Sequence, residues 1–132
     1  MLVVDTSAVI AALAARPPND EVVARLAGDG DLAAPYLLDV EFLHATWRLV
    51  LGRRLGEDRA ADARDDFAAL AIARYEHTLV ADRVWELRHR LTAYDATFVA
   101  LAELLEAPLV TCDARLARAP GHRATVELFQ GP

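Results

Sequence analysis

Near the start of the sequence, Leu2-Val3-Val4-Asp5-Thr6-Ser7 is a short apolar run that stops at a carboxylate and leads into a helix-forming stretch. A short run with no polar alternation predicts a strand that is buried on both faces of a sheet. The same pattern returns near the end of the chain as Leu109-Val110-Thr111-Cys112-Asp113. These two stretches predict a parallel sheet with a carboxylate at the carboxyl end of two of its strands.

The segments around these two stretches alternate between helical and strand-like patterns. We expect strands at 2–4, 32–34, 75–78, 109–112 and 124–129. We expect helices at 7–15, 19–26, 37–51, 56–71, 80–91 and 95–106, with a helical turn at 114–117. This alternation predicts an α/β fold, a three-layer sandwich in which helices flank a small, mainly parallel sheet of four or five strands.

The length of 132 residues predicts a single domain over 1–132. Residues 129–132 are either native or the remnant of an engineered protease site, so we exclude them from functional reasoning. The chain lacks a signal-peptide pattern and any apolar stretch long enough to cross a membrane, which favours a soluble, cytoplasmic protein. The single cysteine, Cys112, excludes an internal disulfide and a four-cysteine zinc site, and we expect an inert core thiol.

The charge balance is acidic, with 20 Asp and Glu against 14 basic residues, all of them Arg, and a formal net charge of −6. Taken alone, this balance argues against a protein that binds nucleic acid through overall positive charge. The hydrophobic fraction of 55% excludes disorder as the general state of the chain.

Four carboxylates stand where an α/β sheet would place chemistry. Asp5 and Asp113 each follow a strand, Asp95 begins a helix, and Glu41 lies in a long helix on one face with His44. If all four share one edge of the sheet, they require a cation, and ligands that are all oxygen favour Mg²⁺ or Mn²⁺ over zinc. Taken singly, each of these residues is better explained as a helix cap or a solvated helix position.

Three hydroxyl side chains flank these carboxylates. Thr6, Ser7 and Thr111 can orient a carboxylate or bind a metal-bound water, although local capping explains Ser7 equally well. Other catalytic patterns are missing from the sequence, which has no HExxH zinc motif, no GxSxG elbow and no phosphate-binding Walker loop.

The motifs around these carboxylates resemble those of PIN-domain ribonucleases, most closely the VapC-type toxins of bacterial type II toxin–antitoxin pairs. The resemblance covers the chain from Leu2 to about Phe129. It implies that Asp5, Glu41, Asp95 and Asp113 form a catalytic Mg²⁺ site, with Mn²⁺ as an alternative, supported by Thr6, Ser7 and Thr111. Some relatives carry a further acidic residue shortly after the last Asp; residues 114–117 contain none, which leaves the number of ions open.

The resemblance also implies an endoribonuclease that cleaves cellular RNA (tRNA, rRNA or mRNA) by attack of a metal-activated water on a phosphodiester. It implies a homodimer and a small VapB-type antitoxin that wraps the toxin and inserts a basic side chain among the carboxylates. Candidates for the antitoxin groove are Val9, Leu13, Trp47 and Leu51, although core packing is the favoured role for Val9 and Leu13.

RNA requires positive charge somewhere on the molecule, and only Arg can supply it from a permanently charged side chain. The candidate RNA-binding arginines are Arg48, Arg53, Arg54, Arg88 and Arg115, with Arg59, Arg90 and Arg118 close to them in sequence. Ordinary solvated helix charge is an equally good explanation for these residues.

Two other functions stay open. The chain could be a catalytically weak PIN-like module that acts by binding RNA or a partner protein. It could also be a phosphatase-like α/β enzyme with Asp5 as nucleophile, although Ser7 stands where such phosphatases carry a second Asp.

Overall fold

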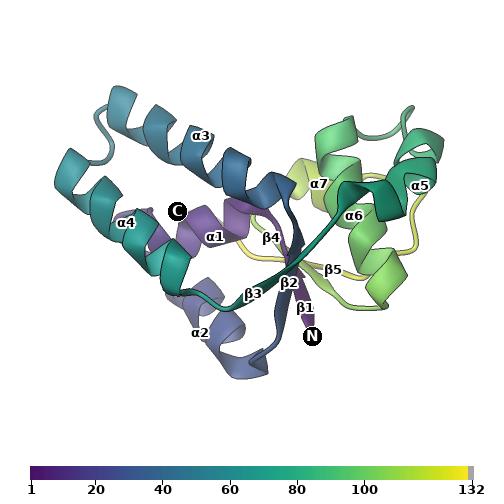
Figure 1. Ribbon diagram of the computed structural model, residues 1–132, viewed down its shortest axis with the longest axis horizontal. Coiled ribbons are helices and arrows are strands. Elements are labelled where there is room, and N and C mark those ends of the chain that lie inside the picture. The colour runs from purple at the N-terminus through teal and green to yellow at the C-terminus, as the bar shows by residue number, and fades with distance from the viewer. Residues whose placement is uncertain (131–132) are drawn as a thin grey trace.

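The computed structural model describes residues 1–130 and contains a five-stranded sheet (Figure 1). All pairs of neighbouring strands are parallel, in the order β3-β2-β1-β4-β5. The strands are β1 (Leu2–Val4), β2 (Leu32–Pro35), β3 (Ile72–Tyr75), β4 (Leu109–Thr111) and β5 (Val126–Leu128). The prediction of an α/β fold with a small parallel sheet is confirmed.

Helices cover both faces of this sheet. They are α1 (Thr6–Leu13), α2 (Asp20–Asp29), α3 (Leu37–Leu51), α4 (Glu57–Ala69), the 3₁₀ helix η1 (His77–Val80), α5 (Ala81–Glu86), α6 (Ala93–Leu105) and α7 (Ala114–Arg118). Helices α1 to α4 lie on one side of the sheet, and α6 with α5 packs on the other (Figure 1). No helix within residues 1–130 has the length and apolar character needed to cross a membrane.

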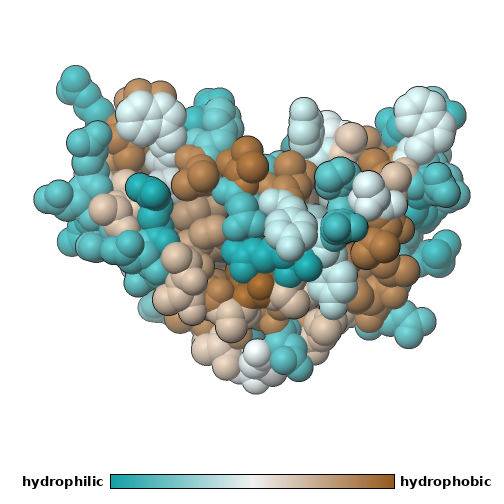
Figure 2. Space-filling view, in the orientation of Figure 1, coloured by the Kyte–Doolittle hydropathy of each residue, from teal (hydrophilic) through white to brown (hydrophobic). Residues whose placement is uncertain are grey.

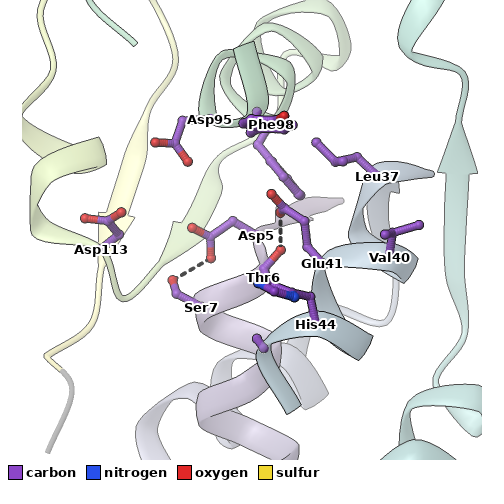
Figure 3. Close-up of a pocket in the computed structure, with 12 residues that line it drawn as sticks. Asp5, Thr6, Ser7, Leu37, Val40, Glu41, His44, Asp95, Phe98 and Asp113 are labelled. Carbon is purple, nitrogen blue, oxygen red and sulfur yellow. Dashed lines mark hydrogen bonds between the residues drawn. The ribbon is translucent and has the colours of Figure 1, made fainter. Parts of the chain in front are cut away.

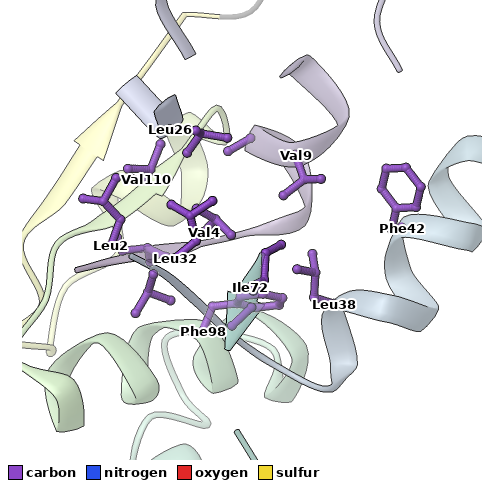
Figure 4. Packing of buried hydrophobic residues seen from close by; sticks show 14 of the residues in the cluster. Leu2, Val4, Val9, Leu26, Leu32, Leu38, Phe42, Ile72, Phe98 and Val110 are labelled. Carbon is purple, nitrogen blue, oxygen red and sulfur yellow. The ribbon is translucent and has the colours of Figure 1, made fainter. Parts of the chain in front are cut away.

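The central strands are apolar because both of their faces are covered. Every residue of β1 is fully buried, and Leu109 and Val110 of β4 are buried beside them (Figure 4). On the side of α1, the rings of Phe42 and Phe67 stack with their centroids 4.1 Å apart and hold α3 against α4. The core therefore fixes the two strands that end at Asp5 and Asp113.

Two predicted elements were placed wrongly. The strand expected at 75–78 lies at 72–75 because Ile72, which is buried, pairs with Leu32 of β2, and residues 77–80 form η1 instead. The helix expected at 80–91 ends at Glu86, where the Leu87 amide bonds to the carbonyls of Arg83 and Val84 and the chain tightens into turns. The other helices and strands differ from the prediction only at their ends.

The tail excluded from functional reasoning is partly built into the fold. The Phe129 amide donates to the Thr111 carbonyl at 2.9 Å, and the Asn19 side chain donates to the Gln130 carbonyl at 2.9 Å. Residues 131–132 lie outside the described residues.

Candidate active site at the strand ends

A pocket of about 560 Å³ opens at the carboxyl ends of β1 and β4 (Figure 3). The chain leaves β1 towards β2 on one side and leaves β4 towards β5 on the other, so the connections diverge at this point. Such a divergence leaves a crevice in a parallel sheet, and ligands bind in crevices of this kind. We call this hollow the acidic pocket.

Four carboxylates from distant parts of the sequence line the acidic pocket: Asp5, Glu41, Asp95 and Asp113. Asp5 directly follows β1, and Asp113 follows β4 after Cys112. Asp95 lies in the first turn of α6, and Glu41 lies in α3. In Figure 3, Asp5 lies in the centre, with Asp95 and Asp113 on one side and Glu41 on the other. The structure thus brings all four predicted carboxylates to one hollow.

Asp5 is the most deeply placed carboxylate of the group, with 5% of its surface exposed. Its Oδ1 accepts hydrogen bonds from Ser7 Oγ at 2.7 Å and from the Ala8 amide at 3.0 Å, and its Oδ2 accepts from Thr111 Oγ1 at 2.5 Å. Burial raises the pKa of Asp5 to about 6, the three hydrogen bonds oppose that rise, and the charge of Asp113 adds to it. Asp5 is therefore fixed in position by its neighbours, and no basic side chain within residues 1–130 forms an ion pair with it.

The remaining hydroxyls connect the other elements. Thr6 Oγ1 donates to Glu41 Oε1 at 2.5 Å, which joins α1 to α3. Ser7 Oγ accepts from the Cys112 amide at 2.8 Å and lies 3.2 Å from Thr111 Oγ1. All three predicted hydroxyl residues thus contact a carboxylate of the pocket, in the orienting role expected of a supporting shell.

Asp95 and Asp113 share one cationic neighbour. Arg115 Nη2 lies 3.5 Å from Asp95 Oδ2 and 3.5 Å from Asp113 Oδ2, and the Arg115 side chain is 78% exposed. Burial and the charge of Asp113 raise the pKa of Asp95, while Arg115 and the hydrogen bond from Thr92 oppose the rise. A single exposed guanidinium offsets only part of the negative charge of the pocket.

The chemistry of the pocket fits a hard divalent cation. Its donors are carboxylate and hydroxyl oxygens. Burial is the main cause of the raised pKa values of Asp5 and Asp95, and the charge of Asp113 adds to both. Within residues 1–130, no three Asp, Glu, His or Cys side chains are drawn together closely enough to hold an ion as they stand. Ion binding would therefore require these side chains to close in around it.

The capping explanation is correct for two of the four carboxylates. Capping a helix does not prevent a carboxylate from also binding a metal ion. Asp5 caps α1 through the Ala8 amide, and Asp113 caps α7 through the amides of Arg115 and Leu116. Asp95 is not a cap, because the Thr92 side chain accepts from the Asp95 amide and caps α6. Each capping carboxylate satisfies backbone donors with its Oδ1, while the Oδ2 of Asp5 accepts from Thr111 and the Oδ2 of Asp113 lies 3.5 Å from Arg115 Nη2.

The candidate arginines fall into two separate groups. Arg48, Arg53 and Arg54 are exposed at the far end of α3 and do not line the acidic pocket. Arg88 and Arg115 line a second hollow next to Asp95, together with His89 and Arg90. The sequence pattern did not single out His89, and no sequence signal marked it.

Several uncharged residues that the sequence did not mark also line the acidic pocket, among them Leu37, Val40, Tyr94 and Phe98. His44 lines the pocket as well, as expected from its place on the Glu41 face of α3. Apolar walls exclude water and strengthen the electrostatic interactions of the carboxylates within them.

The remaining predicted residues divide by burial. Val9 is fully buried and Leu13 is half-buried, so core packing is their role, whereas Trp47 and Leu51 are 52% and 63% exposed. Cys112 was expected within the strand at 109–112, but β4 ends at Thr111 and Cys112 lies just after it, half-buried. Burial and the charge of Asp5 raise the pKa of Cys112 to about 11, which keeps the thiol unreactive.

The chain is similar to several known proteins. The model of the PIN domain family matches residues 2–122. The chain is 42% identical to Ribonuclease VapC1 of Mycobacterium tuberculosis over 129 residues, which is 97% of each chain. It is 41% identical to Ribonuclease VapC9 of the same organism over 116 residues, which is 88% of each chain.

A solved structure shares the fold at lower sequence identity. VapBC2 from Rickettsia felis, bound to a DNA fragment from its promoter, matches with a TM-score of 0.70 and 16% identity. The match covers 97% of this chain and 98% of that one.

Proposed function

The chain belongs to the PIN-domain family and, within it, to the VapC ribonucleases, and we propose that it is a Mg²⁺-dependent endoribonuclease. In this proposal it is the toxin of a VapBC-type pair, acts on cellular RNA in the cytoplasm, and is neutralised by a cognate antitoxin. The observation that carries the proposal is the convergence of four carboxylates, from β1, α3, α6 and β4, on one pocket at the divergence of the sheet.

Asp5, Glu41, Asp95 and Asp113 would hold the ion, with Mn²⁺ as an alternative to Mg²⁺. When bound, such an ion generates a hydroxide nucleophile from water and stabilises charge on the phosphoryl oxygens. The protein supplies the positioning: Thr111 and Ser7 fix both oxygens of Asp5, and Thr6 fixes Glu41. These hydrogen bonds limit the movement that Asp5 and Glu41 would make when the pocket closes around an ion.

The test is cleavage of a mixed cellular RNA preparation with Mg²⁺, with Mn²⁺ and with EDTA. We expect cleavage with either ion, none with EDTA, and a loss of at least 100-fold in Asp5→Asn and Asp95→Asn. Asp82→Asn, an exposed position on α5 outside the acidic pocket, is the matched control and should cleave normally. Cleavage that survives EDTA or either pocket substitution would contradict the proposal.

A catalytically weak module that binds RNA or a partner protein is the alternative, and the absence of an acidic residue at 114–117 keeps it open. Titration calorimetry with Mg²⁺ separates the two, because a module that only binds RNA has no need of the ion. Metal binding that Asp95→Asn abolishes supports the enzyme, and RNA binding without metal binding supports the module.

For the antitoxin we propose a docking surface on the exposed side of α3. Val40, Leu43, Trp47 and Leu51 form an exposed apolar stripe at helical spacing, and Figure 2 shows hydrophobic side chains along this helix. Next to the stripe a groove between α3 and α4 is lined by Leu43, Trp47 and Ala60 among others. An amphipathic helix of the partner fits such a groove.

The antitoxin candidate is the product of a short reading frame next to the gene for this chain, if that frame encodes a DNA-binding protein. Co-purification of this product with the chain tests the proposal. Trp47→Glu should weaken the complex without unfolding the chain, whereas Asp82→Asn should leave it intact. Retention of the complex by Trp47→Glu would exclude this surface.

We also propose that the chain forms a homodimer. Its surface would be the apolar hollow of about 530 Å³ lined by Tyr36, Val40, Ala81, Val84 and Tyr94, which lies between α3, α5 and α6. Tyr36 and Tyr94 are 55% and 62% exposed there, and exposed aromatic residues of this kind are typical of protein interfaces.

A further inference from the structure

A second pocket, of about 360 Å³, adjoins the acidic pocket and carries the opposite charge. Three arginines and a histidine line it: Arg88, His89, Arg90 and Arg115. Asp95 lines both pockets, so the two hollows meet at the first turn of α6. We call the second hollow the basic pocket.

Two arginines of the basic pocket, Arg88 and Arg90, contact neighbouring groups of the chain that restrict their side chains. The Arg88 guanidinium lies over the Trp85 ring, 4.5 Å from its centroid, and donates to the Trp85 carbonyl at 2.8 Å. The Arg90 side chain packs against Gly121, where an added Cβ would lie 3.4 Å from Arg90 Cγ. Guanidinium groups held in this way lose less freedom when they bind a ligand.

The loop that carries Gly121 is itself fixed. Arg83 donates to the Gly121 carbonyl at 3.1 Å and, through two nitrogens, to both carboxylate oxygens of Glu103 at 2.8 and 3.1 Å. Glu103 also accepts from the Arg123 amide at 2.6 Å. The wall behind Arg90 is therefore a connected network, and the basic pocket is a built feature of the fold.

We propose that the basic pocket binds a backbone phosphate of the RNA strand that neighbours the phosphate to be cleaved. This inference rests on the proposed ribonuclease function and adds where the strand is held. The chain has a net charge of −6 and its reactive pocket is acidic, so RNA must be drawn to a local concentration of positive charge. The basic pocket supplies that charge directly beside the carboxylates, and planar guanidinium groups match phosphate oxygens.

Phosphate is a better occupant than an RNA base. The pocket is lined by charged and polar side chains, with Leu91 the one apolar residue among those of the described chain that line it. Its arginines present N–H donors to phosphate oxygens, whereas no Trp, Tyr or Phe side chain among residues 1–130 lines it.

The experiment measures binding of a fluorescein-labelled single-stranded RNA of twelve nucleotides by fluorescence anisotropy. EDTA is present, so that cleavage cannot occur. The variants are Arg88→Gln with Arg90→Gln together, and Arg64→Gln on α4 as a matched exposed control that lines neither the acidic nor the basic pocket. We expect the double variant to bind about 10-fold more weakly and Arg64→Gln to bind normally.

The dependence of binding on salt gives an independent readout. Each lost phosphate contact reduces the magnitude of the slope of log K against log salt by about 0.7 for single-stranded nucleic acid, so the double variant, which loses one phosphate site, should reduce it by about 0.7. A further set of RNAs carries one uncharged methylphosphonate linkage, placed at a different position in each RNA. At one of these positions the methylphosphonate should weaken binding to the original chain but not to the double variant. Unfolding curves that match the original chain show that the variant is folded.

The outcomes separate the two proposals. If the original chain cleaves RNA in Mg²⁺ and the double variant keeps its affinity and salt slope, the basic pocket is not a phosphate site although the ribonuclease proposal stands. If the original chain neither cleaves nor binds RNA, the ribonuclease proposal itself fails.

Discussion

Thr111 Oγ1 donates a hydrogen bond to Asp5 Oδ2 at 2.5 Å, although the two residues are 106 positions apart in the sequence. The same hydroxyl oxygen accepts from the Asp113 amide at 3.0 Å. Because Thr111 is fully buried at the end of β4, one side chain sets the position of the carboxylates that follow both central strands. The acidic pocket is thus organised by the pairing of β1 with β4.

Thr111→Val removes this donor and keeps the shape and β-branching of the side chain. We expect RNA cleavage to fall about 10- to 100-fold, the range typical of partners that orient metal ligands, because Asp5 loses a hydrogen bond that holds it in place. Cleavage rates at several Mg²⁺ concentrations provide the measurement. Thr111→Ser, which keeps the hydroxyl, should retain most of the activity, and equal losses in both variants would show that packing alone matters at this position.

The raised pKa of Asp5 makes the metal-free protein less stable as the pH rises. Because the folded state holds the Asp5 proton up to a pKa of about 6 and the unfolded chain releases it near 3.8, stability falls between these values and stays low above them. We expect the original chain to lose roughly 1 kcal/mol between pH 5 and pH 7.5 relative to Asp5→Asn, which lacks the titrating group.

Urea unfolding in EDTA at the two pH values measures this difference. Asp82→Asn, which removes an exposed carboxylate on α5, should behave as the original chain does. The same pH dependence in the original chain and in Asp5→Asn would mean that Asp5 is ionised without penalty.

Arg115 occupies part of the space where a cation would neutralise Asp95 and Asp113, so it should compete weakly with a metal ion. We expect Arg115→Gln to bind Mg²⁺ or Mn²⁺ about two- to five-fold more tightly, since an exposed pair of this kind contributes at most about 1 kcal/mol. Calorimetric titration gives the affinity directly. Arg115→Lys and Arg64→Gln should bind metal as the original chain does, and an unchanged affinity in Arg115→Gln would show that Arg115 does not compete.

The sequence was most informative at Asp5 and Asp113, because a strand of three or four apolar residues followed by Asp is a local pattern. Parallel strands end at one edge of the sheet, so two such patterns suffice to predict that the carboxylates lie near each other. The direction of Glu41 and Asp95 could not be derived in this way, since the face that a helix turns towards the sheet depends on packing. Their assignment came from the family resemblance.

The basic pocket shows what periodicity misses. Arg88, His89 and Arg90 fall in a stretch that the spacing of apolar residues predicts as helix, where consecutive side chains point in different directions. In the structure α5 ends at Glu86, and the turns that follow present all three side chains to one hollow. The strand at 72–75 was misplaced for a related reason: an edge strand carries few buried residues, and only Ile72 is buried there.

The apolar hollow between α3, α5 and α6 leads to a prediction about association. Ala81→Arg places a charge on an exposed helix position that lines this hollow, so it should separate a homodimer without disturbing the core. Light scattering coupled to size-exclusion chromatography should give twice the chain mass of 14.4 kDa for the original chain and the single mass for the variant. Arg64→Gln, on α4 and outside this hollow, should remain a dimer. If Ala81→Arg remains a dimer, the interface lies elsewhere on the surface. If the original chain is a monomer, the homodimer proposal is wrong. The acidic pocket is unaffected by that result, because all its lining residues belong to one chain.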